Sequence, residues 1–473
     1  MLETIIKQMI NSRWIVMMGA LSICAFGVWN FQNLSIDAVP DITNVQVQIN
    51  TEAPGYSPLE SEQRITFPIE TTLAGLPQLS YTRSLSAYGL SQVTVVFEEG
   101  TDIYFARNLV NSRLSAIKNQ LPANLEPEMG PISSGLGEIF MYTVSAEAGA
   151  LQSNGEPYDL FALREIQDWI IKRQLILVDG VTEVNTSGGF EKQYHVKPDP
   201  AKMLLWGITL PELLSALRDN NINQGAGYIE RNGQQLMVRS PGQLKTIADI
   251  EQVSILSRNS IPVRVKDVAE VSIGKELRTG AGTHSGQEAV IGTAFMLLGE
   301  NSRTVAREVA AKLEEINTTL PDGVVAEPLY DRTVLVDNAI ATVEENLVVG
   351  ALLVVVVLFL LLGNIRAALI TATVIPISML ATISGMVEVG VSANLMSLGA
   401  LDFGIIVDGA VIIVENSIRR LGKATHGSKV LSLKARLQVV YEATNEVIRP
   451  SLFGVAIITL VYIPIFSLTG IEG

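Results

Sequence analysis

The sequence contains little cysteine and little charge, and each shortage excludes a class of protein. Its single cysteine, Cys24, lies inside an apolar run, so it can form neither an intrachain disulfide nor a cysteine-based metal site. Only 17% of the 473 residues are charged and 48% are hydrophobic, which departs from a typical soluble domain. The net charge of −14 argues against a nucleic-acid partner. There is no phosphate-binding loop, so we expect neither ATP as an energy source nor a bound cofactor.

The hydrophobic residues that are present gather in five runs, which predict a chain that crosses a lipid bilayer several times. Residues 1–31 hold an amphipathic segment and then the first run, whose ends are marked by Trp14 and Trp29 as expected at membrane interfaces. A cleaved signal peptide is the alternative, although no small-residue cleavage site follows. The remaining spans are expected over 347–363, 367–390, 393–414 and 450–468.

Basic residues orient these spans, because cytoplasmic loops carry an excess of Lys and Arg. Such residues occur near the N-terminus, at Arg366 and along the predicted loop 419–449, so we expect all three segments in the cytoplasm. The long segment between the first two spans then lies on the outer side. An odd number of spans also puts the C-terminus outside, directly after a span, so we expect the chain to be the front part of a longer protein.

The segment between the first and second spans contains stretches of alternating apolar and polar residues, which are typical of strands with one buried face. Over 32–137 the predicted order is strand, helix, two strands, helix and strand, the split βαβ or ferredoxin-like arrangement. A second unit of this kind begins over 138–180 and resumes over 272–346. The material between, 181–271, would be an inserted subdomain. The predicted fold class is therefore an α-helical transmembrane bundle plus an α+β outer region.

The acidic stretch ALDFGIIVDGAVIIVENSIRRL, residues 400–421, is apolar enough for a membrane helix yet contains Asp402, Asp408 and Glu415. An aspartate near the bilayer centre costs about 2.5–3.5 kcal/mol to insert, so a compensating role is expected. For Glu415 the alternative is a structural ion pair with Arg419, one turn further on. No Lys or Arg lies in the middle of any predicted span, so Asp408 has no basic partner there. Such a carboxylate can take up and release a proton, which predicts a proton relay that drives transport.

Five long stretches, spread along the whole chain, point to one family. They are DAVPDITNVQVQINTEAPGYSPLESEQRITFPIE, TRSLSAYGLSQVTVVFEEGTDIYFARNLVNSRL, MGPISSGLGEIF, GVTEVNTSGGFEKQYHVKPDP and LDFGIIVDGAVIIVEN. Together with the layout above, they resemble the resistance–nodulation–division (RND) efflux pumps, most closely the heavy-metal efflux branch of the cobalt–zinc–cadmium type. The resemblance covers about the first half of such a pump, and in the family a second half repeats the plan.

The resemblance implies a role for each part of the chain. Asp402, Asp408 and Glu415 match the acidic positions that the family uses for proton coupling. The two ferredoxin-like units would be periplasmic porter subdomains, and the insertion would be the docking subdomain. A homotrimer in the inner membrane of a Gram-negative bacterium is implied, with a periplasmic adaptor protein and an outer-membrane channel as partners.

Divalent ions are the expected cargo, with zinc, cobalt, cadmium and nickel as candidates. Copper and silver pumps favour methionine, a soft ligand, and the methionines of the outer region are scattered rather than clustered. The stretch DFGIIVDGA also resembles the divalent type. Glu138 and Asp168 are the candidate metal ligands, although both could equally be solvated surface charges. His195 and His284 are weaker candidates, because a lone histidine is more often a surface or core residue than a ligand.

Three alternatives stay open. An RND pump for drugs or other amphiphiles would need an aromatic-lined pocket, and only 6% of residues are aromatic. A membrane-anchored sensor would need a cytoplasmic signalling domain, which is not recognisable here, and it gives no reason for carboxylates in a membrane helix. An inert half-pump is also compatible, because in the family the metal path lies partly between the two halves.

Overall fold

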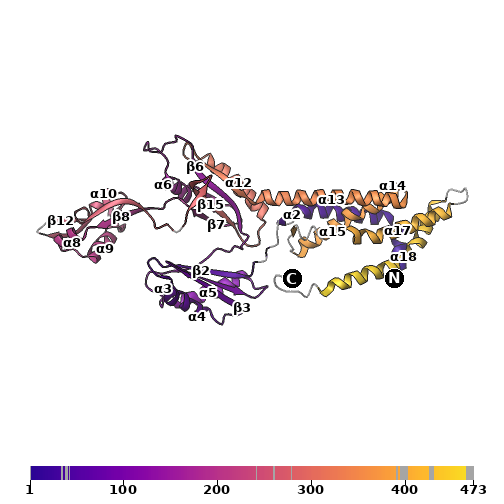
Figure 1. Ribbon diagram of the computed structural model, residues 1–473, viewed down its shortest axis with the longest axis horizontal. Coiled ribbons are helices and arrows are strands. Elements are labelled where there is room, and N and C mark those ends of the chain that lie inside the picture. Colours follow the sequence, from indigo (N-terminus) through magenta and orange to yellow (C-terminus); the bar gives the residue numbers. More distant parts are fainter. Residues whose placement is uncertain are drawn as a thin grey trace.

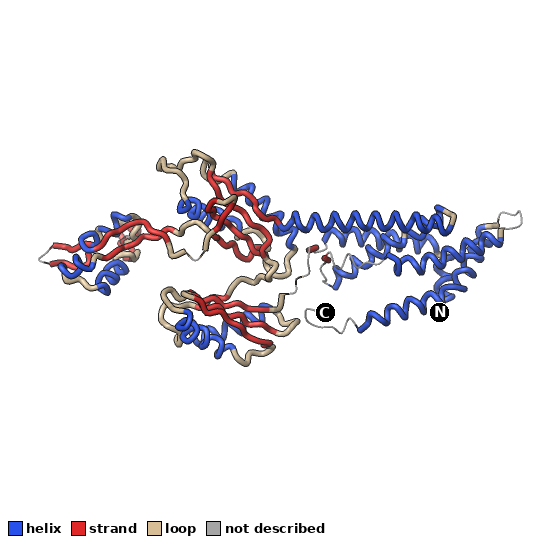
Figure 2. Tube along the Cα trace, viewed as in Figure 1, coloured by secondary structure: helices blue, strands red, loops and turns tan. Residues whose placement is uncertain are grey.

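The computed structural model describes residues 2–33, 36–37, 41, 43–240, 242–258, 261–278, 280–389, 393–394, 403–425 and 431–464. The molecule is elongated, with long helices at one end, two units of sheet and helix next to them, and a smaller unit at the far end (Figure 1). Almost all strands lie in the half away from the long helices (Figure 2). This division matches the predicted combination of a helical bundle and an α+β region.

Four helical stretches among the described residues are long and apolar enough to cross a membrane. A further helix, α17 (Phe403–Ala424), contains most of the acidic stretch and packs along α18. A short amphipathic helix, α1 (Leu2–Asn11), precedes the first span. The four stretches belong to α2 (Arg13–Asn33), α13 (Arg332–Leu362), α14 (Ile365–Ala372) with α15 (Val374–Val389), and α18 (Leu433–Tyr462).

Three of the predicted spans differ in extent from the helices of the structure. α13 begins at Arg332 and α18 at Leu433, because polar turns extend both helices beyond the apolar runs that located them. The predicted cytoplasmic loop before the last span is therefore largely helical. Ala393–Asn394 form strand β17, which pairs in parallel with β1 (Ile36–Asp37), so the span predicted over 393–414 does not begin there.

The first outer unit is a four-stranded antiparallel sheet with helices packed against it. The strand order is β3-β4-β2-β5, so two strands that are not consecutive in sequence form the centre. Val47 and Ile49 of β2 share one buried core with Val110 and Leu114 of α5. The elements are β2 (Gln46–Glu52), α3 (Pro58–Ser61), the π-helix η1 (Glu62–Thr66), α4 (Phe67–Leu73), β3 (Leu79–Ala87), β4 (Leu90–Phe97), α5 (Ile103–Ile117) and β5 (Pro127–Met129).

The second outer unit has a five-stranded sheet assembled from segments far apart in the sequence. β15 pairs with β6 on one edge and with β7 and β14 on the other, and β6 also pairs with β16. The boundary predicted at residue 181 is too early, because β7 belongs to this sheet and not to the insertion. The elements are β6 (Glu138–Ala146), α6 (Leu160–Ile166), the π-helix η2 (Gln167–Ile171), α7 (Lys172–Leu175), β7 (Val181–Ser187), β14 (Gly282–His284), β15 (Gln287–Met296), α12 (Ser302–Asn317) and β16 (Val324–Asp331).

The smaller unit at the far end is inserted between β7 and β14 (Figure 1). Its first and last strands, β8 and β13, pair along their whole length, so the chain enters and leaves the unit side by side. It has a core of its own that includes Met203, Leu213 and Val263. The elements are β8 (Lys192–Pro198), α8 (Pro200–Trp206), α9 (Leu210–Asp219), β9 (Gln224–Arg231), β10 (Gln234–Ser240), α10 (Ile247–Glu251), β11 (Ser254–Arg258), β12 (Ile261–Arg264), α11 (Val265–Val268) and β13 (Ala269–Lys275).

Candidate functional site

α17 carries two of the three predicted relay carboxylates, and Asp402 lies outside the described residues. Asp408 and Glu415 are seven residues apart, about two helical turns, so they share one face of α17. Both are exposed on the surface of this chain. Arg419 was expected as a partner for Glu415, but its Nη2 donates a hydrogen bond to Asn416 Oδ1 at 2.6 Å instead. Within the described ranges, Glu415 forms no ion pair.

Asp408 lines a cavity of about 360 Å³ between α17 and α18. The two helices approach closely beside it, since a Cβ added to Gly409 would lie 3.8 Å from Ser451 Oγ. Most of the wall is apolar, and its two acidic residues are Asp408 on α17 and Glu446 on α18. The lining residues are Asp408, Gly409, Ile412, Glu446, Val447, Pro450, Ser451, Gly454, Val455 and Ile458.

A hydrogen-bond network around Asn416 holds α17 and α18 together at one end of this cavity. The Asn416 side chain is buried, and its Nδ2 donates to Ala443 O at 2.7 Å and to Glu446 Oε2 at 3.0 Å. Arg420 donates to the same Oε2 from Nε at 3.1 Å and from Nη2 at 2.7 Å. Arg419 adds its hydrogen bond to Asn416 Oδ1, so four nitrogen atoms donate hydrogen bonds at this contact between the two helices.

Sequence reasoning missed both Glu446 and Asn416. Glu446 lies in the segment that we predicted as a cytoplasmic loop, and Asn416 was not among the predicted site residues. The sequence does contain one signal at Glu446. Pro450 follows it by four residues, and a proline inside a helix has no N–H to bond the carbonyl four residues earlier. That signal is visible only once the segment is known to be helical.

The two candidate metal ligands differ in whether an ion pair or a hydrogen bond already occupies their carboxylate oxygens. Asp168 lies in η2, where its Oδ2 is 2.5 Å from Arg164 Nε and its Oδ1 accepts a 2.6 Å hydrogen bond from Thr186 Oγ1. Glu138 begins β6 and is exposed, and within the described ranges no hydrogen bond engages its carboxylate. The part of the chain that the structure describes contains no group of three or more His, Cys, Asp or Glu side chains able to hold a metal ion.

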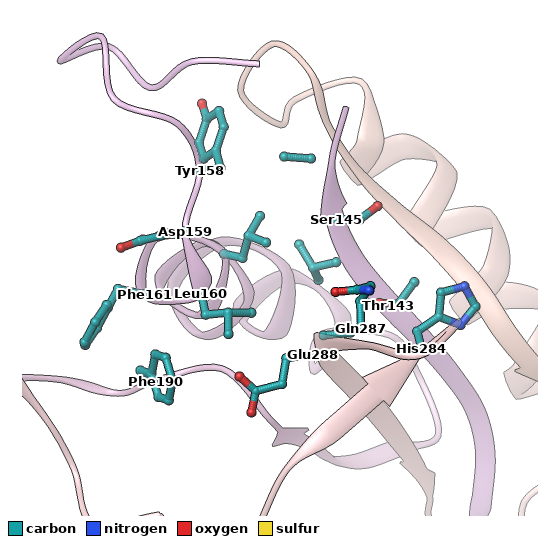
Figure 3. Close-up of a pocket in the computed structure, with 14 residues that line it drawn as sticks. Thr143, Ser145, Tyr158, Asp159, Leu160, Phe161, Phe190, His284, Gln287 and Glu288 are labelled. Carbon is teal, nitrogen blue, oxygen red and sulfur yellow. The ribbon is translucent and has the colours of Figure 1, made fainter. Parts of the chain in front are cut away.

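A larger cavity, of about 550 Å³, lies between the start of α6 and the β14–β15 hairpin (Figure 3). Its acidic side chains already have other partners. Asp159 caps α6 by accepting a hydrogen bond from Ala162 N at 2.9 Å, and Glu288 Oε1 is 2.5 Å from Arg278 Nη2. His284 stands apart from Asp159 on the other side of the cavity. These side chains do not converge on one point, so the cavity offers no set of metal ligands.

Two carboxylates meet where the chain crosses between the second sheet and the inserted unit. Glu191 precedes β8 and Glu276 follows β13, and both line a cavity of about 270 Å³. Burial and then the negative charge of Glu191 raise the pKa of Glu276 above its usual value of 4.5. Beside them, Lys275 Nζ lies 4.6 Å and Arg278 Cζ 5.3 Å from the centre of the Phe190 ring. At this crossing, two neighbouring carboxylates therefore lie beside an aromatic ring that has two cations close to it.

Comparison with known proteins gives one consistent result. A family model described as the AcrB/AcrD/AcrF family matches residues 5–473. The protein HelA of Legionella pneumophila is 61% identical over 474 residues, and the cobalt-zinc-cadmium resistance protein CzcA of Cupriavidus metallidurans is 56% identical. Both alignments cover 100% of this chain and 45% of the relative, so the chain spans less than half of their length.

The cation efflux system protein CusA of Escherichia coli K12 is 38% identical over the whole chain. Among solved structures, an X-ray crystal structure of a heavy metal efflux pump matches with a TM-score of 0.87 and 33% identity. That match covers 99% of this chain and 45% of the crystallised one. The likeness therefore extends to both the helical end and the outer units.

Proposed function

Because the chain belongs to the AcrB/AcrD/AcrF family, and among RND pumps to the heavy-metal efflux branch, we propose that it exports divalent metal cations in exchange for protons. It would act as a secondary active transporter rather than as an enzyme. The observation that carries this proposal is Asp408, a carboxylate on α17 with no ion pair among the described residues, at the wall of a largely apolar cavity against the membrane-crossing helix α18.

The position of Asp408 supports the proposed proton coupling. No ion pair engages Asp408 among the described residues, and the cavity wall offers it few polar neighbours. We propose Asp408 as the proton carrier of the relay because it is a carboxylate on α17 at the wall of this cavity. Movement of one proton across the membrane supplies about 2.3 kcal/mol per 100 mV of potential. Asp402 and Glu415 are proposed as its companions in the relay.

The cargo is proposed to be zinc, cobalt, cadmium or nickel. Support comes from the names of similar proteins, which include the cobalt-zinc-cadmium resistance protein CzcA and, at 47% identity, the nickel-cobalt-cadmium resistance protein NccA. Glu138 is the better candidate ligand, because its carboxylate is exposed and has no hydrogen bond among the described residues. Asp168 could bind a metal only after it released Arg164 or Thr186.

We also propose that the two outer units are ferredoxin-like porter subdomains and that the inserted unit docks a partner. The strand orders support the first part: once the short strand β14 is set aside, the first and third strands of each unit are central and the second and fourth are at the edges. The pairing of β7 moves the start of the proposed docking subdomain to about residue 188. A homotrimer in a Gram-negative inner membrane, with a periplasmic adaptor and an outer-membrane channel, completes the proposed assembly.

Growth of a metal-sensitive, pump-deleted bacterium tests this function. The complete native gene is expressed with its adaptor and channel, and zinc, cobalt, nickel, cadmium, copper and silver are each titrated. We expect resistance to at least one divalent ion, loss of that resistance in Asp408→Asn, and its retention in Glu442→Gln. Glu442 is an exposed acid on α18 whose carboxylate, among the described residues, accepts a hydrogen bond from Gln438 alone, so it is a matched control.

Two results would contradict the proposal, provided that protein levels are normal. One is resistance to none of the metals. The other is resistance that Asp408→Asn leaves intact. Either result would favour a pump for amphiphiles or an inert half-pump.

A further inference from the structure

The cavity between α17 and α18 joins Asp408 to a second carboxylate, Glu446. α17 contributes Asp408 to Ile412 and α18 contributes Glu446 to Ile458, so the cavity runs along the seam between the helices. Gly409 lies opposite Ser451, whereas Asn416 lies opposite Glu446. At 1.5 Å per residue, these two levels of α17 are roughly 10 Å apart. Glu446 therefore stands at the end of the cavity nearer the α17–α18 connection.

That end is the one we expect at the cytoplasmic surface. The last turns of α17 and the first turns of α18 carry a cluster of basic residues, and such clusters mark cytoplasmic segments. Glu446 thus lies between Asp408 and the cytoplasmic side of the membrane. The basic residues are Arg419, Arg420, Lys423, Lys434 and Arg436.

The carboxylate of Glu446 has one engaged oxygen and one free oxygen. All three hydrogen bonds from Asn416 and Arg420 go to Oε2. Within the described ranges Oε1 receives none. A carboxylate held through one oxygen keeps its position while the other oxygen takes up or releases a proton. The network therefore fixes Glu446 without occupying the atom that would titrate.

Pro450 adds a second acceptor at the same place. It lies inside α18 and has no N–H, so the carbonyl of Glu446, four residues earlier, lacks its usual helical donor. A backbone carbonyl in apolar surroundings needs another partner, and water in a cavity can supply it. Glu446 O, Glu446 Oε1 and Asp408 thus join the Ser451 hydroxyl as polar points along a largely apolar wall.

We propose that Glu446 is a second proton-carrying residue, which receives the proton that leaves Asp408 and passes it to the cytoplasm. The inference rests on the proposed proton coupling. Protonated Asp408 gives up one proton into the cavity and becomes a carboxylate again. Glu446 Oε1 takes up that proton through water, and Oε2 stays bonded to Asn416 and Arg420. The proton then leaves Oε1 for cytoplasmic water, which returns Glu446 to its charged form.

Proton flux through the complete native pump in proteoliposomes tests this assignment. Zinc is added and the internal pH is followed with a dye over a range of external pH, for wild type, Asp408→Asn, Glu446→Gln, Glu446→Asp and Glu442→Gln. Glu446→Gln keeps an acceptor for Arg420 but cannot carry a proton. We expect it to slow zinc-dependent flux roughly 100-fold, the low end of the contribution of a positioned proton-transfer group. Glu446→Asp should restore flux with a shifted pH profile, and Glu442→Gln should match wild type.

The outcomes separate this inference from the proposed function. Wild-type flux and pH profile in Glu446→Gln, with flux lost in Asp408→Asn, would show that Glu446 only ties the helices together. Full flux in Asp408→Asn would overturn the proton coupling itself and this inference with it. Glu446→Gln can be compared only if it assembles, as judged by size-exclusion chromatography. If it does not, Glu446→Asp tests the assignment instead, and an unshifted pH profile of proton flux in that variant would overturn it.

Discussion

Replacement of Gly27 by alanine tests how closely the first span packs in this fold. Gly27 is buried on α2 and faces α15, where an added Cβ would lie 2.5 Å from Leu380 Cβ and 2.8 Å from Leu380 O. Neither atom can move unless the helix moves, and overpacking of this kind costs about 1–3 kcal/mol. Alanine also favours a helix by roughly 1 kcal/mol over glycine, which partly offsets the clash.

Gly19 on the same helix separates the two effects, because nothing lies within 4 Å of the Cβ it would gain. Thermal unfolding of the detergent-solubilised protein is the assay. Gly19→Ala should be at least as stable as wild type, and Gly27→Ala should unfold about 1–3 kcal/mol more easily than Gly19→Ala. Equal stability of the two variants would refute the close packing of α2 on α15.

Two further predictions concern the outer units. Asp168→Asn removes the charge that pairs with half-buried Arg164, so we expect a loss of up to about 1.5–3 kcal/mol in unfolding experiments, whereas exposed Asp179→Asn should be neutral. Glu276 has a raised pKa in the folded protein, so the unfolding free energy falls as the pH rises from about 4.5 through that pKa. Glu276→Gln should therefore melt higher than wild type at neutral pH and not at about pH 4, and a pH-independent difference would contradict the raised pKa of Glu276.

The elements of this fold could be predicted where the signal is local. Apolar runs located the membrane-crossing helices, but only their apolar parts, which is why the starts at Arg332 and Leu433 were missed. The partner of β7 could not be predicted, because β15 lies about a hundred residues later in the sequence. The residues of the two strands also do not specify the register in which they pair. Pairing of this kind is decided by the whole core rather than by neighbours in sequence.

The candidate site divides in the same way. Asp408 could be named as a candidate from its own surroundings, since a carboxylate inside an apolar run is conspicuous. Glu446 could not, because the role that we propose for it depends on a cavity shared with α17 and on hydrogen bonds from Asn416 and Arg420. Arg419 shows the converse error: its spacing from Glu415 suits an ion pair, yet the side chain bonds to Asn416. Helical spacing permits such a contact without choosing it.

Proton movement on addition of metal is the most direct test of the central claim, that Asp408 couples metal export to proton entry. The complete native pump is reconstituted in proteoliposomes under an imposed pH gradient, and zinc is added while the internal pH is followed. The account predicts a zinc-dependent proton flux in wild type that an uncoupler and Asp408→Asn both abolish. Zinc transport that persists in Asp408→Asn, or that needs no pH gradient, would contradict it.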